Sequence, residues 1–301
     1  MKIGVFDSGF GGLTILQNIR QVLPEYDYLY LGDSARAPYG TRSFEVIYEY
    51  TLQAVRYLEA QGCRLIIIAC NTASAKALRT IQQRDINPDK LRVLGVIRPT
   101  VEAVTNPTPL LPYSSTPLLP YSSTPLLPKH IGVLATSGTV SSGSYLIELE
   151  KLNPLLEVSQ QACPMWVPLI ENNEIDSPAM DYYIKKYIDL LFVKDPDIDT
   201  IILGCTHYPL IKDKIENYLN SKLINETATL NSKLSTLNLI TQGSIVADSL
   251  RDYLSRHYEI DCELSRGGQC EYLTTDVPDK FETSASLFLS EPIHANQIEL
   301  A

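Results

Sequence analysis

Two cysteines, Cys70 and Cys205, each follow a short apolar run, and the two runs are nearly alike. Residues 66–69 read Ile-Ile-Ile-Ala, and residues 201–204 read Ile-Ile-Leu-Gly. An apolar, largely β-branched run of this length predicts a buried parallel strand. Open α/β sheets carry their chemistry at the carboxyl ends of their strands. The matched positions therefore predict two thiols that face one substrate from opposite sides.

The residues after each cysteine can move protons or bind a ligand. Cys70-Asn71-Thr72 precedes a predicted helix, whose dipole and free N–H groups favour a thiolate. Asn71 or Thr72 can cap that helix or donate hydrogen bonds to a ligand. His207 lies two residues after the second cysteine, where an imidazole can exchange a proton or orient a substrate. A single buried cysteine is ordinarily an inert packing residue, so the chemical interpretation depends on the pair.

Three further loops follow predicted strands and are rich in polar groups. Residues 7–12 read Asp-Ser-Gly-Phe-Gly-Gly, and the helix after them can attract a phosphate or a carboxylate, although the third glycine of a dinucleotide fingerprint is missing. Residues 32–40 end in the turn signal Pro-Tyr-Gly, and residues 136–139 read Thr-Ser-Gly-Thr. Apart from Arg36 and Arg98, these regions offer no guanidinium, so hydroxyls, backbone N–H groups and helix N-termini would hold a small anionic substrate. The carboxylates and hydroxyls in question are those of Asp7, Ser8, Asp33, Thr136, Thr139 and Thr206.

Strand-like and helix-like stretches alternate along the chain, as in βαβ units with a mostly parallel sheet. Strands are predicted at 2–6, 27–32, 64–69, 92–97, 131–135, 155–160, 200–204 and 271–275. Helices are predicted at 13–22, 43–61, 73–84, 141–152, 178–193, 209–220 and 244–257. We therefore predict an α/β fold of two pseudo-symmetric lobes, with mostly parallel sheets flanked by helices and the active site in the cleft between the lobes.

An internal similarity supports two lobes. Residues 3–9 and 131–139 begin alike with Ile-Gly-Val, and each run leads through helices and strands to one of the two cysteines. The first lobe is assigned to residues 1–98 and 209–301, the second to 99–208, and the tail from 258 is expected to pack on the first lobe. Between them, a proline-rich octapeptide repeats across 108–128, which we interpret as an inserted surface loop.

Composition narrows the class of protein. The net charge of −10 and the pI near 4.9 argue against a nucleic-acid-binding surface and against docking on an anionic membrane. The apolar runs are strand-sized, and the amino terminus lacks a signal-peptide pattern, so a cytoplasmic protein is expected. The six cysteines form no Cys-x-x-Cys pair and are predicted to be free thiols without a bound metal.

Six motifs stand in a characteristic order. They are Asp7-Ser8-Gly9-x-Gly11-Gly12, Gly32-Asp33-x-x-x-x-Pro38-Tyr39-Gly40, Ala69-Cys70-Asn71-Thr72, Thr136-x-Gly138-Thr139, Val167-Pro168-Leu169-Ile170-Glu171 and Gly204-Cys205-Thr206-His207-Tyr208-Pro209. Together they resemble the glutamate racemases of the aspartate/glutamate racemase superfamily. The resemblance runs from residue 1 to about 257 and is interrupted by the repeat.

The resemblance implies interconversion of L- and D-glutamate without a cofactor, supplying D-glutamate for peptidoglycan, in a homodimer. It assigns Cys70 to the α-proton of D-glutamate and Cys205 to that of L-glutamate, with Asp7 and His207 as assisting acid/base groups. It also matches Asp33 and Glu171 to acidic residues that modulate the reaction. The residues predicted to bind substrate are Asp7, Ser8, Tyr39, Gly40, Asn71, Thr72, Thr136, Thr139, Thr206 and His207. Elementary chemistry agrees, because inversion through a planar carbanion needs a base and an acid on opposite faces, and a thiol can be either.

Two alternatives remain open. Aspartate racemases share the fold and the thiol pair, but the resemblance places an acidic residue in them where this chain has His207. A non-catalytic, two-lobed amino-acid-binding protein would not need the thiols. One departure from the family concerns Thr241-Gln242, where an Asp-Ser pair is usual; we expect that position to be peripheral to the chemistry.

Overall fold

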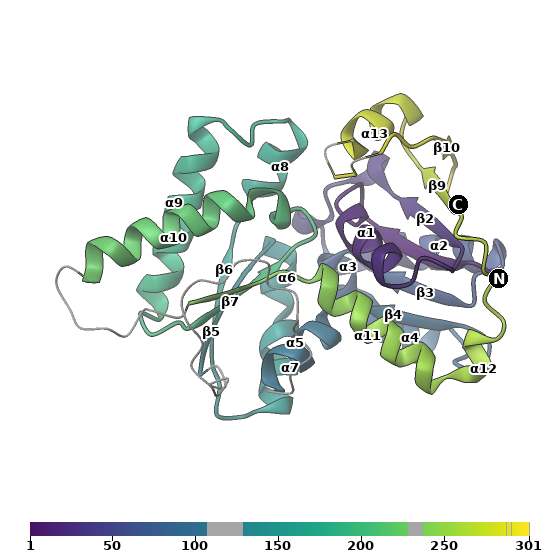
Figure 1. Cartoon of the computed structure of the whole chain (residues 1–301), viewed down its shortest axis with the longest axis horizontal. Coiled ribbons are helices and arrows are strands. Elements are labelled where there is room, and N and C mark those ends of the chain that lie inside the picture. The colour runs from purple at the N-terminus through teal and green to yellow at the C-terminus, as the bar shows by residue number, and fades with distance from the viewer. Residues whose placement is uncertain (107–128, 228–236, 287, 290, 301) are drawn as a thin grey trace.

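The computed structural model describes residues 1–106, 129–227, 237–286, 288–289 and 291–300. Two parallel sheets, each flanked by helices, form two lobes that lie side by side (Figure 1). This arrangement confirms the predicted fold class. The repeat predicted at 108–128 lies outside the described residues.

The first sheet has six strands in the order β10-β9-β2-β1-β3-β4, and every neighbouring pair is parallel. The strands are β1 (Ile3–Asp7), β2 (Tyr28–Gly32), β3 (Leu65–Ile68), β4 (Arg92–Gly95), β9 (Cys270–Thr274) and β10 (Ala295–Gln297). The residues of β1, β2 and β3 are all buried, which explains their unbroken apolar runs. The tail contributes β9 and β10, so it extends this sheet as well as packing on the first lobe.

The second sheet has the order β6-β5-β7-β8 and is also parallel throughout. Its strands are β5 (His130–Ala135), β6 (Glu157–Ala162), β7 (Thr200–Gly204) and β8 (Asn238–Ile240). The local order β6-β5-β7 repeats the order β2-β1-β3 of the first sheet. This repetition confirms the internal similarity seen in the sequence.

Strand register places both cysteines at equivalent sheet edges. Phe6 pairs with Ile68, so Cys70 lies just beyond the end of β3 and next to the loop that follows β1. Ala135 pairs with Gly204, so Cys205 lies just beyond the end of β7 and next to the loop that follows β5. The carboxyl-edge prediction is therefore confirmed for both thiols.

Most helices follow the predicted alternation. In chain order they are α1 (Leu13–Val22), α2 (Phe44–Ala60), α3 (Asn71–Lys76), α4 (Leu78–Arg84), α5 (Ile97–Thr105), α6 (Ser137–Ser142), α7 (Ser144–Leu152), α8 (Trp166–Glu171), α9 (Pro178–Lys194), α10 (Lys212–Thr227), α11 (Gly243–Arg256), α12 (Tyr258–Asp261) and α13 (Pro278–Ala285). Of these, α5, α8, α12 and α13 were not predicted. Short 3₁₀ turns lie at Ser34–Arg36, Tyr39–Thr41 and Tyr208–Ile211. Local chemistry sets their bounds: the Ser43 and Ser177 hydroxyls cap α2 and α9, and Pro178 fits the first turn of α9.

Several elements of the structure differ from the predicted ones. The helix predicted at 73–84 starts at Asn71 and breaks at Ala77, and that at 141–152 starts at Ser137 and breaks at Gly143, whose φ is +66°. Strand β6 lies two residues later than predicted. Strand β8 pairs with β7, so residues 238–240 belong to the second sheet, although 209–301 was assigned to the first lobe. That assignment failed because a three-residue strand leaves almost no periodic signal.

The two lobes share a hydrophobic core. One cluster of buried apolar side chains runs from Leu16 and Ile19 of α1 to Trp166, Ile188 and Tyr208 of the second lobe. Helix α11 returns from β8 and packs closely along α1, as Figure 1 shows. Among the described residues, no helix is long and apolar enough to span a membrane.

Candidate active site

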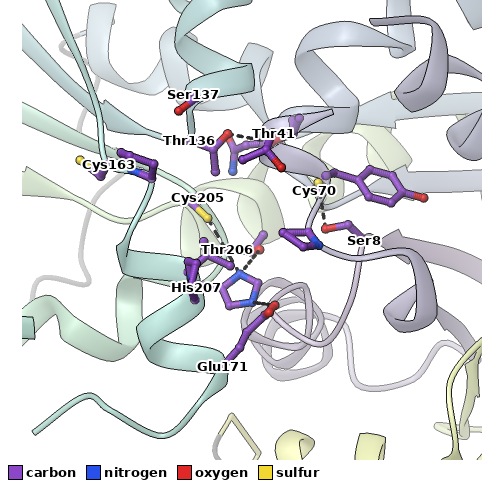
Figure 2. Close-up of a pocket in the computed structure, with 18 residues that line it drawn as sticks. Ser8, Thr41, Cys70, Thr136, Ser137, Cys163, Glu171, Cys205, Thr206 and His207 are labelled. Atoms are coloured by element: carbon purple, nitrogen blue, oxygen red, sulfur yellow. Dashed lines mark hydrogen bonds and ion pairs between the residues drawn. The ribbon is translucent and has the colours of Figure 1, made fainter. Parts of the chain in front are cut away.

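A cavity lies between the two sheet edges that carry Cys70 and Cys205, and both thiols line it (Figure 2). Both cysteines are nearly buried, with exposed fractions of 5% and 6%. The cavity is lined by Ser8, Pro38, Tyr39, Gly40, Thr41, Cys70, Asn71, Thr72, Thr136, Ser137, Cys163, Pro164, Val167, Pro168, Glu171, Cys205, Thr206 and His207. It therefore collects side chains from both lobes around two thiols.

Cys70 has a neutral partner and a buried acidic neighbour. Its Sγ lies 3.4 Å from the Ser8 hydroxyl oxygen. Burial raises the pKa of Cys70 to about 12, and the nearby Asp7 carboxylate adds to the rise. The helix dipole of α3 was expected to favour a thiolate, but burial outweighs the effect of this six-residue helix, and no side chain caps it. Cys70 is thus held as a thiol.

Asp7 lies behind the cavity wall and is fully buried. Its carboxylate accepts a hydrogen bond from the Gly9 backbone N–H at 3.0 Å and from the Thr206 hydroxyl at 3.4 Å. Burial raises its pKa. A β-carbon on Gly12 would lie 2.5 Å from Cβ of Asp7, and one on Gly11 would lie 2.4 Å from Nδ1 of His207. The glycines of this loop therefore make room for two protein side chains, a use that the anion-binding interpretation did not foresee.

Cys205 has a charged partner. Its Sγ lies 3.9 Å from Nδ1 of His207, and Nε2 of the same ring lies 3.1 Å from a Glu171 carboxylate oxygen. Figure 2 shows the three groups in a row, with Glu171 reaching up from α8. Burial alone would lower the pKa of His207, but the hydrogen bonds and charges of Cys205 and Glu171 raise it to about 10. His207 is therefore a cation at neutral pH.

Asp33 is fully buried and does not line the cavity. It accepts hydrogen bonds from the Tyr39 hydroxyl, from the Arg36 Nε at 2.7 Å and from the Thr275 hydroxyl at 2.8 Å. Tyr39 and Gly40 do line the cavity, so Asp33 positions their loop from behind. Gly40 lies so close to the second lobe that a β-carbon there would be 2.9 Å from Cβ of Thr136.

Three threonine hydroxyls link the lobes beside the thiols. Thr72 of α3 lies 2.9 Å from Thr136 and 3.4 Å from Thr139, oxygen to oxygen, and Thr136 and Thr139 are 3.1 Å apart. Thr136 also caps α6 through the Thr139 N–H. Thr72 and Thr136 line the cavity, whereas Thr139 is fully buried behind them.

The position at Gln242 is not peripheral, contrary to expectation. Gln242 is 2% exposed, and its side-chain oxygen accepts a hydrogen bond of 2.6 Å from Nδ2 of the cavity residue Asn71. The expectation failed because Asn71 and Gln242 are 171 residues apart in sequence, so no local pattern joins them.

Most predicted site residues come together. Of these, Ser8, Tyr39, Gly40, Cys70, Asn71, Thr72, Thr136, Glu171, Cys205, Thr206 and His207 line the cavity, while Asp7, Asp33 and Thr139 support it from behind. The two arginines do not line the cavity, where they could bind an anionic substrate. Arg36 pairs with Asp33, and Arg98 pairs with Glu102 and Glu148 at the surface.

Several residues that line the cavity were not predicted from the sequence. Five of them adjoin or belong to the predicted motifs, so their positions beside those motifs are a signal that could have identified them: Pro38, Thr41, Ser137, Val167 and Pro168. Cys163 and Pro164 belong to no predicted motif, because nothing in the sequence places the end of β6 beside β5. Among the described residues, no group of three or more His, Cys, Asp and Glu side chains could hold a metal ion.

Comparison with known proteins places this chain in a family. No protein-family model matches the sequence. The chain is 38% identical over 293 residues to the glutamate racemase of Ruegeria sp. (strain TM1040), and the aligned region covers 97% of this chain and 98% of that relative. It is 35% identical over 302 residues to the glutamate racemase of Persephonella marina, covering all of this chain and 98% of that relative.

Solved structures agree with these relatives. The fold matches the glutamate racemase of Francisella tularensis, solved in complex with D-glutamate, with a TM-score of 0.79, 31% identity and coverage of 99% and 97% of the two chains. An aspartate racemase from Picrophilus torridus matches at a TM-score of 0.51 and 18% identity, over 86% of this chain and 99% of that one, which shows a common fold. The chain belongs to the glutamate racemase family.

Proposed function

We propose that this protein interconverts L- and D-glutamate without a cofactor, by proton transfer between two thiols on opposite sides of the substrate. The observation that carries the proposal is one cavity lined by Cys70 and Cys205, each with its own polar partner. A protein that only bound an amino acid would have no use for two such thiols.

In the direction from L- to D-glutamate, the thiolate of Cys205 takes the α-proton. The Cα–H bond breaks, an S–H bond forms, and the electron pair stays on a planar α-carbon. The thiol of Cys70 then gives its proton to the opposite face and is left as a thiolate. The reverse direction exchanges the two roles, and the His207 cation balances the negative charge of Cys205 whenever that thiol is deprotonated.

The remaining lining groups suit an anionic substrate. The Thr72 and Thr136 hydroxyls and the Asn71 amide offer hydrogen-bond donors without a fixed positive charge. In a buried cavity, preorganised donors stabilise developing charge more strongly than water does. Asp7 and Glu171 are assigned the assisting roles at Cys70 and His207, and Asp33 the role of holding Tyr39.

The preference for glutamate over aspartate rests on the full-length relatives and on His207. The test is incubation in deuterated water with L-glutamate and, separately, with L-aspartate. We expect D-glutamate that carries deuterium at the α-carbon, and no comparable product from aspartate. Faster conversion of aspartate would favour the aspartate racemase alternative, and binding of glutamate without α-deuteration would favour a binding protein.

We also propose a cytoplasmic homodimer that supplies D-glutamate for peptidoglycan synthesis. Family membership is the support for this role. Sedimentation of the purified chain tests the dimer: a sedimenting mass near twice the 33.6 kDa of the chain is expected, and a monomer at assay concentration would contradict it.

A further inference from the structure

Four polar side chains form a buried network that reaches the cavity wall at Asn71. They are Asn71 at the start of α3, Thr100 of α5, Tyr145 of α7 and Gln242 just before α11, and each is at most 2% exposed. Gln242 lies at the centre: its Nε2 is 2.9 Å from the Thr100 hydroxyl and 2.9 Å from the Tyr145 hydroxyl, and its Oε1 is 2.6 Å from Nδ2 of Asn71. The Tyr145 hydroxyl closes the network at 2.8 Å from Oδ1 of Asn71.

A backbone carbonyl fixes the direction of every hydrogen bond in this network. The Thr100 hydroxyl donates to the Val96 carbonyl at 2.7 Å, and a carbonyl can only accept. Thr100 therefore accepts from the Gln242 amide nitrogen, which places the Gln242 oxygen toward Asn71. Burial raises the pKa of Tyr145, so its hydroxyl stays protonated and donates to the Asn71 oxygen.

The result is a single orientation for the Asn71 side-chain amide. Its oxygen is committed to Tyr145 and one of its N–H groups to Gln242. Among the described residues, Asn71 Nδ2 makes that one hydrogen bond, so its second hydrogen is available to an oxygen of the substrate. An amide turned the other way would present an oxygen to an anionic substrate, which would repel it.

We propose that Gln242 is a positioning residue that holds Asn71 with a hydrogen-bond donor available to the substrate. The role rests on the proposed function insofar as the ligand is glutamate. Gln242 supports recognition by acting through Asn71 and does not itself line the cavity. The same network joins α3 of the first lobe to α7 of the second, so it also fixes the wall at the junction of the lobes.

The first test compares Gln242→Met, Asn71→Ala and the double variant in the full chain. Gln242→Met keeps the length of the side chain and removes both polar atoms. We expect KM for both enantiomers, and the Kd of D-glutamate measured by calorimetry, to rise roughly tenfold or more, with a smaller change in kcat. On the Asn71→Ala background the same substitution should change Kd less than about twofold, because coupled residues are not additive. A folded Gln242→Met protein with the wild-type KM and Kd, or an equal loss on both backgrounds, overturns the proposal.

Two threonine variants provide a second test, which decides the proposal if Gln242→Met does not fold. Thr100 and Thr51 are both fully buried, and each donates to the carbonyl four residues earlier in its helix. Thr100 alone of the two accepts from Gln242. Thr100→Val should raise KM and Kd severalfold, whereas Thr51→Val should lower the melting temperature without changing either. Equal KM values for the two variants overturn the proposal.

Binding separates this proposal from the proposed function. A wild-type chain that binds D-glutamate but does not racemise it overturns the proposed function, and the Kd values still decide the role of Gln242. A wild-type chain that neither binds nor racemises glutamate overturns both.

Discussion

The two thiol sites have equivalent positions in the two sheets but opposite electrostatics. Cys70 follows β3, contacts the neutral Ser8 hydroxyl and has a pKa raised to about 12 by burial and by Asp7. Cys205 follows β7 and contacts His207, which Glu171 and Cys205 hold as a cation. Topology therefore places the thiols symmetrically, while side chains from other elements decide where each proton resides. Cys70 is therefore held as a thiol beside a carboxylate, whereas Cys205 lies beside a cation.

The largest expected effect comes from removing either thiol. Cys70→Ala and Cys205→Ala should each lower kcat/KM by roughly 10³-fold or more, because each direction of the reaction needs both a base and an acid. The two enantiomers have equal free energies, so kcat/KM must fall by the same factor in both directions. Polarimetry or chiral chromatography of the product measures this loss.

Cys63→Ala is the matched control for these variants. Cys63 is buried at 1% exposure, burial raises its pKa to about 11, and it does not line the cavity. It should keep wild-type kcat/KM. Racemisation at the wild-type rate by either Cys70→Ala or Cys205→Ala would rule out the two-thiol mechanism.

The second prediction concerns the charge on His207 and uses pH. The pKa of His207 rises from 6.5 in the unfolded chain to about 10 in the folded protein, so its stabilising contribution is complete below pH 6.5 and is lost as pH rises through 10. The melting temperature of the wild type should therefore fall more steeply between pH 7 and pH 9.5 than that of His207→Asn. The raised pKa values of Cys63 and Cys70, which do not depend on His207, are common to both proteins and cancel in the difference. If the melting temperatures of the two proteins fell equally steeply over this pH range, His207 would be neutral in the folded protein.

The sequence predicts this asymmetry only in part, because it shows contacts between residues that are close along the chain better than contacts between distant ones. The thiols and His207 were predicted because apolar strands and their end residues form local patterns. Glu171 was found by resemblance alone, since the six-residue α8 has too little periodicity to indicate a helix. Gln242 was misjudged, because its contact with Asn71 depends on how α11 returns between the lobes. Sequence patterns of period 2 or 3.6 predict strands and helices. The side chains that set the protonation of a thiol or an imidazole are brought beside it by tertiary packing, which such patterns do not show.

The third prediction weakens the cation at the Cys205 site. Glu171→Gln removes the carboxylate 3.1 Å from His207 Nε2, so the pKa of His207 should fall and kcat/KM should decrease about tenfold, the scale of one charged hydrogen bond. Glu174→Gln, three residues further on and exposed, is the control and should leave kcat/KM unchanged. The fall of kcat/KM at alkaline pH should also begin at a lower pH in Glu171→Gln than in the wild type. If it begins at the same pH, Glu171 does not set the charge of His207.

The smallest effect is expected at the neutral partner of Cys70. Ser8→Ala removes a hydroxyl 3.4 Å from Sγ, and a long hydrogen bond to sulfur between uncharged groups is worth little, so kcat/KM should fall only about two- to fivefold. Because burial and Asp7 hold the proton on Cys70, that thiol should stay protonated without Ser8. Thiolate absorbance of Ser8→Ala, measured against Cys70→Ala across alkaline pH, checks this directly. A loss as large as that of Glu171→Gln would mean that both thiols depend equally on a hydrogen-bonding partner, and the electrostatic contrast between the two sites would then not govern the reaction.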